Sequence, residues 1–193
     1  MSMLLALAVA AGNSLPTDDL AVEAMNNFGA CVVAQTPQAA REILALDYWT
    51  PAYDKKMRVV AKGHSRCAPG TELRFNHLLF AGALAEALVK LDLGSNELPQ
   101  KLAYDPAREP IPARSPTEEM ALCTALNAPQ ATAAVLGTEP ASAEELHAMR
   151  PLGSVLSECL KKGAKVALNR PALRSVLALA AYRIVSTPMK PTE

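Results

Sequence analysis

Two long stretches of the chain are apolar on nearly every side of the helix that each would form. They cover residues 77–91 and 170–185 and are rich in leucine and alanine. Because a helix that is apolar all round has to be buried on most sides, we expect these two helices at the centre of the fold. Each stretch follows an asparagine, Asn76 or Asn169, and asparagine is a favourable N-cap.

Six further helices, three before each central one, are predicted to surround the central pair. Ser115-Pro-Thr-Glu118 and Ser142-Ala-Glu-Glu145 have the form of capping boxes, which mark helix starts. Pro151 is expected to interrupt one helix, because an interior proline removes a backbone hydrogen bond. Aromatic residues make up only 4% of the chain, and the abundant alanine and leucine favour helices over strands. The fold class predicted is all-α, with further helices at about 18–34, 37–45, 50–67, 116–126, 129–137 and 142–159.

The order of these helices reflects an internal repeat with a period of 92 residues. Aligning residues 31–67 with residues 123–159 gives nine identities in 37 positions without a gap, including both cysteines of each segment. After a one-residue shift, Asn76 aligns with Asn169. We therefore expect two tandem four-helix repeats related by approximate twofold pseudosymmetry. The predicted organisation is repeat 1 at 17–91, a Pro-rich linker at 94–114, repeat 2 at 115–185 and a tail at 186–193.

The chain has four cysteines, and each predicted repeat contains two of them at the same spacing. The spacing favours one disulfide per repeat, which would join the end of the first helix of a repeat to the end of its third helix. Structural zinc is the rival interpretation, but zinc sites usually include a short Cys-x(2–4)-Cys knuckle, which is missing here. Free buried thiols and a catalytic cysteine are the remaining alternatives. The predicted pairs are Cys31–Cys67 and Cys123–Cys159.

Aromatic residues distinguish repeat 1 from repeat 2. Tyr48, Trp49 and Tyr53 include the only tryptophan of the chain, and the matching positions of repeat 2 are not aromatic. Such side chains can form a ligand platform, because they combine a large contact area with a polar tip. The simpler interpretation, which the sequence favours, is a small cluster that packs the loop between the second and third helices.

A stripe of basic residues is the second difference between the repeats. Lys55, Arg58, Lys62 and Arg66 would fall on one face of the third helix if the helix continued past Gly63. The stripe could bind an anion or an acidic partner. A solvated face is the more common role of such a pattern, and Gly63 could end the helix early.

Few residues suggest catalysis, and no catalytic or phosphate-binding motif is found in the sequence. Glu86 lies among apolar neighbours, but Lys90 follows at the spacing of an i, i+4 ion pair, so a structural pair is expected. Equal numbers of basic and acidic residues, 19 of each, argue against a general nucleic-acid surface. We predict no catalytic residues, metal or cofactor.

The first twelve residues resemble the apolar part of a secretory signal peptide, with Ala8-Val9-Ala10 as a cleavage pattern. No basic residue precedes this segment. Either the segment is an incomplete signal peptide, or it is the apolar start of an ordinary helix. The paired cysteines favour export, because disulfides persist in oxidising compartments. We expect a periplasmic or secreted protein without a transmembrane span.

Two segments resemble a family of small, uncharacterised exported proteins of Gram-negative bacteria. They are Cys-Val-x(4)-Pro-x-Ala-Ala-Arg at residues 31–41 and Gly-Ala-Leu-Ala-Glu-Ala-Leu at residues 82–88. The resemblance covers about residues 28–91 and implies export and paired cysteines, but no activity.

The function expected from the sequence is a non-enzymatic exported binding or structural module. Its partner would be a cell-envelope protein or a small anion. The alternative is an enzyme with a site in the cleft between the repeats, which would use Glu86 or a histidine.

Overall fold

Helices account for all the regular secondary structure in the described part of the chain, which contains no strand. The structure, a computed structural model, describes residues 19–68, 76–93, 96–164 and 166–191, so the predicted signal segment lies outside the described residues. The elements are α1 (Asp19–Gln35), α2 (Pro37–Ala45), α3 (Pro51–Gly63), the 3₁₀ helix η1 (Ser65–Cys67), α4 (His77–Asp92), α5 (Leu98–Leu102), α6 (Pro116–Asn127), α7 (Pro129–Gly137), α8 (Ala143–Met149), α9 (Leu152–Cys159) and α10 (Arg170–Ser186). The all-α prediction is confirmed.

Local sequence signals explain where many of these helices begin. The N-cap side chains accept a hydrogen bond from the backbone N–H three residues on, which satisfies a donor that the helix itself cannot. The break expected at Pro151 is present, since α8 ends at Met149 and α9 begins at Leu152. The residues that cap a helix in this way are Thr50, Asn76, Ser115, Ser142 and Asn169.

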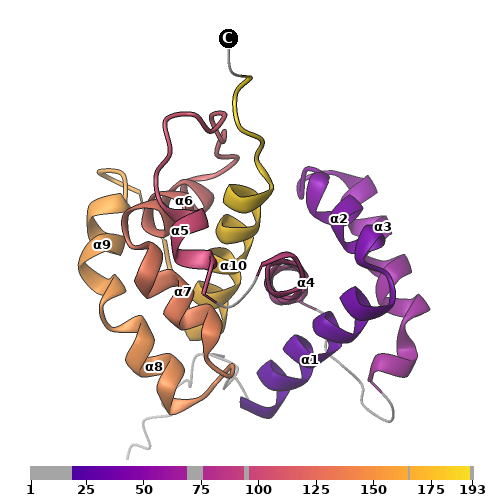
Figure 1. The fold of residues 1–193 in the computed structure, drawn as a ribbon. Helices are drawn as coiled ribbons and strands as arrows, with labels where there is room; N and C mark the ends of the chain where they lie inside the picture. Colours follow the sequence, from indigo (N-terminus) through magenta and orange to yellow (C-terminus); the bar gives the residue numbers. More distant parts are fainter. Residues whose placement is uncertain (1–18, 69–75, 94–95, 165, 192–193) are drawn as a thin grey trace, which may run out of the picture.

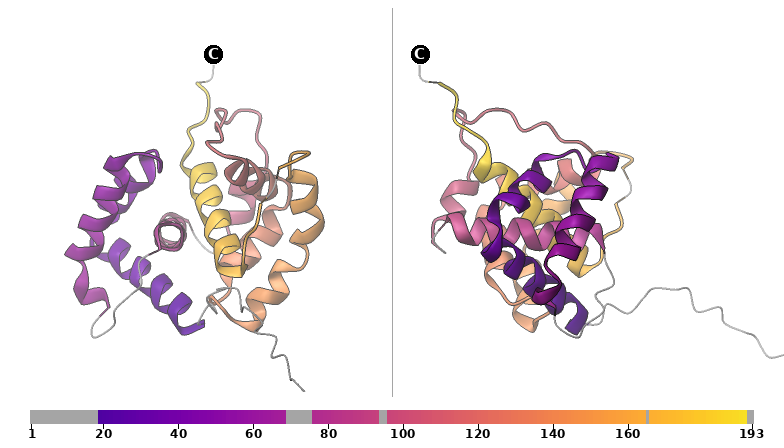
Figure 2. Two further views of the ribbon diagram at one scale, coloured as in Figure 1. Left: turned by 180° about the vertical axis from the view of Figure 1, so that it is seen from behind. Right: turned by 90° about the vertical axis from the view of Figure 1, so that its right-hand side faces the viewer.

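Helix α4 lies at the centre of the molecule. Figure 1 views it end-on, with α1, α2 and α3 on one side and α5 to α10 on the other, and the view from behind in Figure 2 shows the same arrangement. It packs against α1 and against α10. Helix α10 in turn contacts α5, α6 and α7. The two apolar helices predicted to be central therefore form the middle of the core.

Large apolar side chains fill the spaces around α4. The rings of Phe28 and Phe80 lie 5.3 Å apart between α1 and α4, and Leu84 and Leu88 are fully buried. Burying such side chains contributes about 1.5–3 kcal/mol each. Within the segment predicted to be a linker, α5 buries Leu98 and Leu102, and the sequence analysis did not predict this helix.

Two glycines allow α4 to approach its neighbours closely. A Cβ atom placed on Gly82 would lie 2.4 Å from the Cβ and 2.6 Å from the Cα of Ser175 on α10. A Cβ atom on Gly29 of α1 would lie 2.5 Å from the Cβ of Ala83 on α4. These separations are shorter than van der Waals contact, so any larger residue at either glycine would force the helix backbones apart.

We expect Gly82→Ala to lower the free energy of unfolding by about 1–3 kcal/mol, because overpacking displaces backbone here rather than a flexible side chain. Gly153→Ala is the matched control, since no atom lies within 4 Å of a Cβ at that position. The control should gain up to about 1 kcal/mol from the better helix propensity of alanine. Urea unfolding of both variants measures the difference, and equal stabilities would contradict the close approach.

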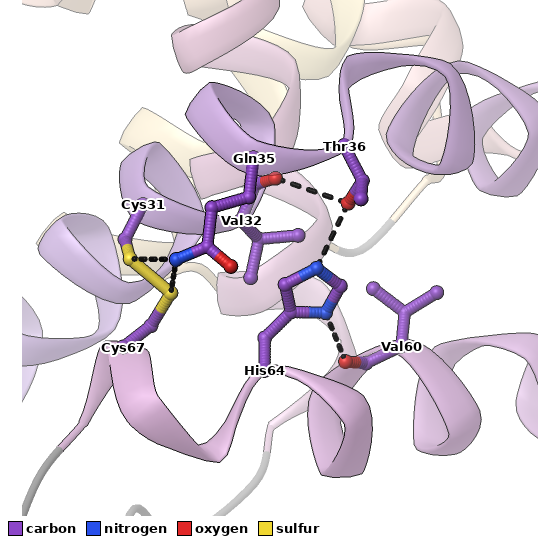
Figure 3. The surroundings of a disulfide bond; sticks show 7 residues. All are labelled: Cys31, Val32, Gln35, Thr36, Val60, His64 and Cys67. Carbon is purple, nitrogen blue, oxygen red and sulfur yellow. Dashed lines mark hydrogen bonds between the residues drawn. A yellow bond between two sulfur atoms is a disulfide. The ribbon is translucent and has the colours of Figure 1, made fainter.

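Both predicted disulfides are present. Cys31 bonds to Cys67 and Cys123 bonds to Cys159, with Cα–Cα distances of 5.7 and 5.6 Å, which lie within the usual range for disulfides. The first bond ties α1 to η1, and the Nε2 of Gln35 donates to both of its sulfurs, at 3.4 and 3.3 Å (Figure 3). No free cysteine remains in the described residues.

Candidate functional site

An apolar cavity of about 360 Å³ lies where the α2–α3 loop meets α4, α6 and α10. Its volume is that of a small-molecule site. Side chains from distant parts of the chain line it, so the cavity exists only in the folded protein. The lining residues come from three groups, which are an apolar set (Leu44, Leu46, Leu78, Ala81, Val176 and Leu179), an aromatic set (Tyr48, Trp49 and Tyr53) and a polar set (His77, Arg114, Ser115, Thr117 and Glu118).

All three aromatic residues that the sequence analysis singled out line this cavity. The rings of Tyr48 and Trp49 lie 4.8 Å apart and are tilted by 45°. Trp49 is 72% exposed, whereas Tyr53 is 6% exposed. The backbone N–H of Trp49 donates to Asp47, which helps to hold this loop. The aromatic residues therefore form a wall that runs from the surface to the buried interior.

The phenol of Tyr53 has a raised pKa. Burial raises the pKa of Tyr53 to about 12, the charge of Arg114 opposes this rise, and Asp54 adds to it. No hydrogen bond of its hydroxyl to another described residue is found. The group is therefore neutral at physiological pH.

Arg114 joins the two sides of the cavity. Its guanidinium lies 4.9 Å from the centre of the Tyr48 ring, within cation–π range. It donates to the carbonyl of Leu46 at 3.1 Å and to Glu118 Oε1 at 2.9 Å. Arg183 of α10 binds the same carboxylate. Arg114 thus connects the α2–α3 loop to α6 and α10.

Glu118 is ionised in this setting. Burial would raise its pKa, but the hydrogen bonds and the charge of Arg114, together with the charge of Arg183, lower the pKa below its ordinary value. Its backbone N–H is also capped by Ser115. The polar wall of the cavity is therefore a fixed set of paired charges.

The three histidines lie in different places. His77 lines the cavity, with Nδ1 3.5 Å from Asp54 Oδ1 and its ring edge-on to Tyr53. His64 contacts the carbonyl of Val60 through Nδ1 and the hydroxyl of Thr36 through Nε2, beside the first disulfide (Figure 3). His147 is exposed on α8. Of the histidines considered for acid–base work, only His77 is placed at the cavity.

Glu86 does not line the apolar cavity but belongs to a buried ion cluster. Arg174 of α10 donates through Nε and Nη2 to both of its carboxylate oxygens, at 2.8 and 2.7 Å. Nη1 of Arg174 donates to Glu145 at 3.0 Å and to the carbonyl of Val135 at 2.9 Å, and Nη2 also reaches the carbonyl of Thr138 at 2.7 Å. These bonds use every N–H of the guanidinium, and Arg174 as a whole residue is 3% exposed.

The predicted Glu86–Lys90 pair is present at 2.7 Å, and it is one part of this larger cluster. Burial raises the pKa of Glu86, but the hydrogen bonds and charge of Arg174 and the contribution of Lys90 lower it to below its ordinary value. Arg170 pairs with the second carboxylate of the cluster, Glu145, at 3.1 Å. Glu86 is therefore an ionised structural group whose oxygens are already occupied.

The basic residues predicted on the third helix are exposed on its outer face. Lys55, Arg58 and Lys62 line an open depression of about 370 Å³, together with Val59. Gly63 is the last residue of α3, so Arg66 belongs to η1 and does not line the depression. No residue that lines the depression also lines the apolar cavity.

Arg114 and the Arg174 cluster were not predicted, and Glu118 was predicted only as part of a capping box. A signal for Arg174 was available, because it lies inside the mainly apolar stretch that becomes α10, whereas Arg170 and Arg183 lie in its first and last turns. Arg114 lies in the segment predicted to be a linker, where nothing distinguished it from other exposed charges.

Comparisons with known proteins leave the family open. The chain matches no protein-family model, no curated protein and no solved structure. Among the described helices, none has the length and apolar character needed to cross a membrane. What the protein does has to be argued from its own surface and cavity.

Proposed function

We propose that this protein is a non-enzymatic exported binding module that holds a small apolar or aromatic molecule in the cavity beside Trp49. One observation carries the proposal. A cavity of about 360 Å³ combines an apolar floor with an aromatic wall whose tryptophan is 72% exposed.

The chemistry of the lining indicates the kind of ligand. Leu179 and Val176 of α10, with Ala81 of α4, supply an apolar floor that favours a hydrocarbon or ring body. Trp49 and Tyr48 can stack on a planar group. We infer that Tyr53, a buried lining residue, supplies a hydroxyl donor for a ligand with a single polar group.

Trp49 provides a direct measurement, because it is the only tryptophan in the chain. Titration with 1-anilinonaphthalene-8-sulfonate, an aromatic anion, should quench Trp49 fluorescence by energy transfer with a single saturable site. Leu179→Asp should weaken this binding about tenfold or more, because a carboxylate on the cavity floor loses solvation when an apolar ligand covers it.

Leu91→Asp is the matched control, since Leu91 is 57% exposed on α4 and does not line the cavity. Circular dichroism of both variants checks that each is folded. Equal binding by the parent protein, Leu179→Asp and Leu91→Asp would reject the cavity as the binding site.

Duplication of an ancestral half is part of the proposal, and two contacts support it. Gly82 and Ser175 occupy matching positions of α4 and α10, at an offset of 93, and a Cβ on Gly82 would meet Ser175. A twofold axis between two copies would bring matching residues together in this way. An amide also sits at the matching position beside each disulfide, since Gln35 donates to Cys31 and Asn127 Nδ2 lies 3.5 Å from the Cys123 sulfur.

Export is proposed because the protein contains two disulfides. Disulfides persist in the periplasm and in secreted proteins, whereas cytosolic thiols are kept reduced. The bonds Cys31–Cys67 and Cys123–Cys159 leave no free thiol in the described residues. A binding module outside the cytosol is consistent with a fold held by these bonds.

A further inference from the structure

The outer face of α3 carries a concentration of unpaired positive charge. Lys55, Arg58 and Lys62 are exposed and form no ion pair with any described residue. They share one face because they are three and four residues apart. Asp54, at the edge of the same depression, is the acidic residue of α3, and its Oδ1 faces His77 at 3.5 Å. The face is therefore locally cationic in a chain of zero net charge.

Apolar side chains are exposed at the same place. Val59 is 60% exposed and lies between Lys55 and Lys62 on this face. Trp49 is 72% exposed and precedes Pro51, the first residue of α3, by two positions. This surface has cations around an exposed apolar residue and a tryptophan near the start of the helix. Such a combination is typical of a protein surface that lies at a membrane interface.

We propose that the outer face of α3 docks on an anionic phospholipid surface. The headgroup phosphates would contact Lys55, Arg58 and Lys62 at the depression of about 370 Å³, and Val59 would lie against the boundary of the acyl chains. Helices α2 and α3 form the outer edge of the molecule opposite α8 and α9, so the face can meet a flat surface (Figure 1). The second half keeps only one of these cations, because the positions that match Lys55, Arg58 and Lys62 hold His147, Arg150 and Ser154.

A bilayer fits these observations better than an acidic polypeptide does. A bilayer presents phosphate charge and an apolar layer together and needs no complementary shape, which suits an open depression on a helix at the molecular edge. The depression and the proposed ligand cavity share no lining residue, although Trp49 of the cavity lies next to the start of α3.

Vesicle co-sedimentation tests the proposal. The full chain should bind vesicles of equal parts phosphatidylglycerol and phosphatidylcholine, should not bind phosphatidylcholine alone, and should be released by added salt. The triple variant Lys55→Gln, Arg58→Gln, Lys62→Gln should bind about a hundredfold more weakly, because each cation near an anionic surface contributes about 1 kcal/mol. Val59→Asp should also weaken binding.

A second triple variant is the control for net charge. Lys101→Gln, Arg150→Gln and Lys162→Gln remove three exposed cations elsewhere and should leave vesicle binding unchanged. Equal loss in the two triple variants, or no binding to the anionic vesicles, would overturn the proposal. Displacement of the protein from vesicles by polyglutamate, but not by soluble phosphate of equal charge, would assign the face to an acidic polypeptide. This result would also overturn the phospholipid proposal. Leu179→Asp should still bind vesicles, which separates this result from a failure of the ligand cavity.

Discussion

Replacing Arg174 with methionine is expected to lower the free energy of unfolding by about 3–5 kcal/mol, because it leaves buried carboxylates without their main partner. Glu86 is 2% exposed and Glu145 is 1% exposed, so neither can recover solvation from water. The change also removes the donors that satisfy the carbonyls of Val135 and Thr138. Equilibrium unfolding in urea measures the loss, which is a large part of the roughly 5–15 kcal/mol that stabilises a typical domain.

Arg58→Met is the control for this experiment, because Arg58 is exposed and makes no ion pair with a described residue; its effect should stay within about 0.5 kcal/mol. The double variant Glu86→Leu, Arg174→Met should be more stable than Arg174→Met alone, since it removes one of the two buried carboxylates that lose Arg174 and leaves only Glu145, which keeps Arg170. A loss below about 1 kcal/mol in the single variant would show that the cluster is more hydrated than the structure indicates.

Removing either disulfide is expected to cost about 3.5–4 kcal/mol, because each bond closes a loop with the same separation of 36 residues. Cys31→Ala with Cys67→Ala, and Cys123→Ala with Cys159→Ala, should therefore lose similar amounts in parallel urea unfolding experiments. Reducing both bonds together should cost about twice as much, which approaches the whole stability of a domain.

The comparison between the two double variants provides the control, since the closed loops have equal length. A loss near zero in one variant would mean that its loop stays compact in the unfolded chain and that the bond constrains little. Mass spectrometry after thiol alkylation, with and without reductant, verifies that the parent protein contains both bonds.

Most of the fold could be predicted from the sequence because its signals are local. Asn76 and Asn169 mark the starts of α4 and α10, and Pro151 separates α8 from α9. The equal cysteine spacing was sufficient to identify both disulfides. These features depend on residues within one turn of a helix or on a spacing that can be counted along the chain.

The buried ion cluster could not be derived in this way. Glu86 and Arg174 are 88 positions apart, and whether they meet depends on how α4 crosses α10. A pair on one helix, Glu86 with Lys90, was predictable because helical geometry places its members together. The ion pair between Glu86 of α4 and Arg174 of α10 depends on how the two helices pack. The spacing of residues along the chain does not determine this packing.

The ligand cavity was predicted only in part. Its aromatic wall was identified because Tyr48, Trp49 and Tyr53 have no aromatic counterpart at the aligned positions 92 residues on. The opposite wall depends on Arg114, which lies in the segment predicted to be a linker and reaches back 68 positions to Leu46. The aromatic platform could therefore be predicted from the sequence, but the cavity that it lines could not.

The Arg174 cluster also has a consequence for the order in which the protein matures. A ribosome synthesises the chain from its amino end, so Glu86 is made long before Arg174, its main partner in the folded protein. Until residue 174 emerges, Lys90 of the same helix is the cation next to Glu86, and burial of α4 against α10 would lack the main partner of this carboxylate. The last helix therefore supplies the side chain that stabilises the buried carboxylate of α4.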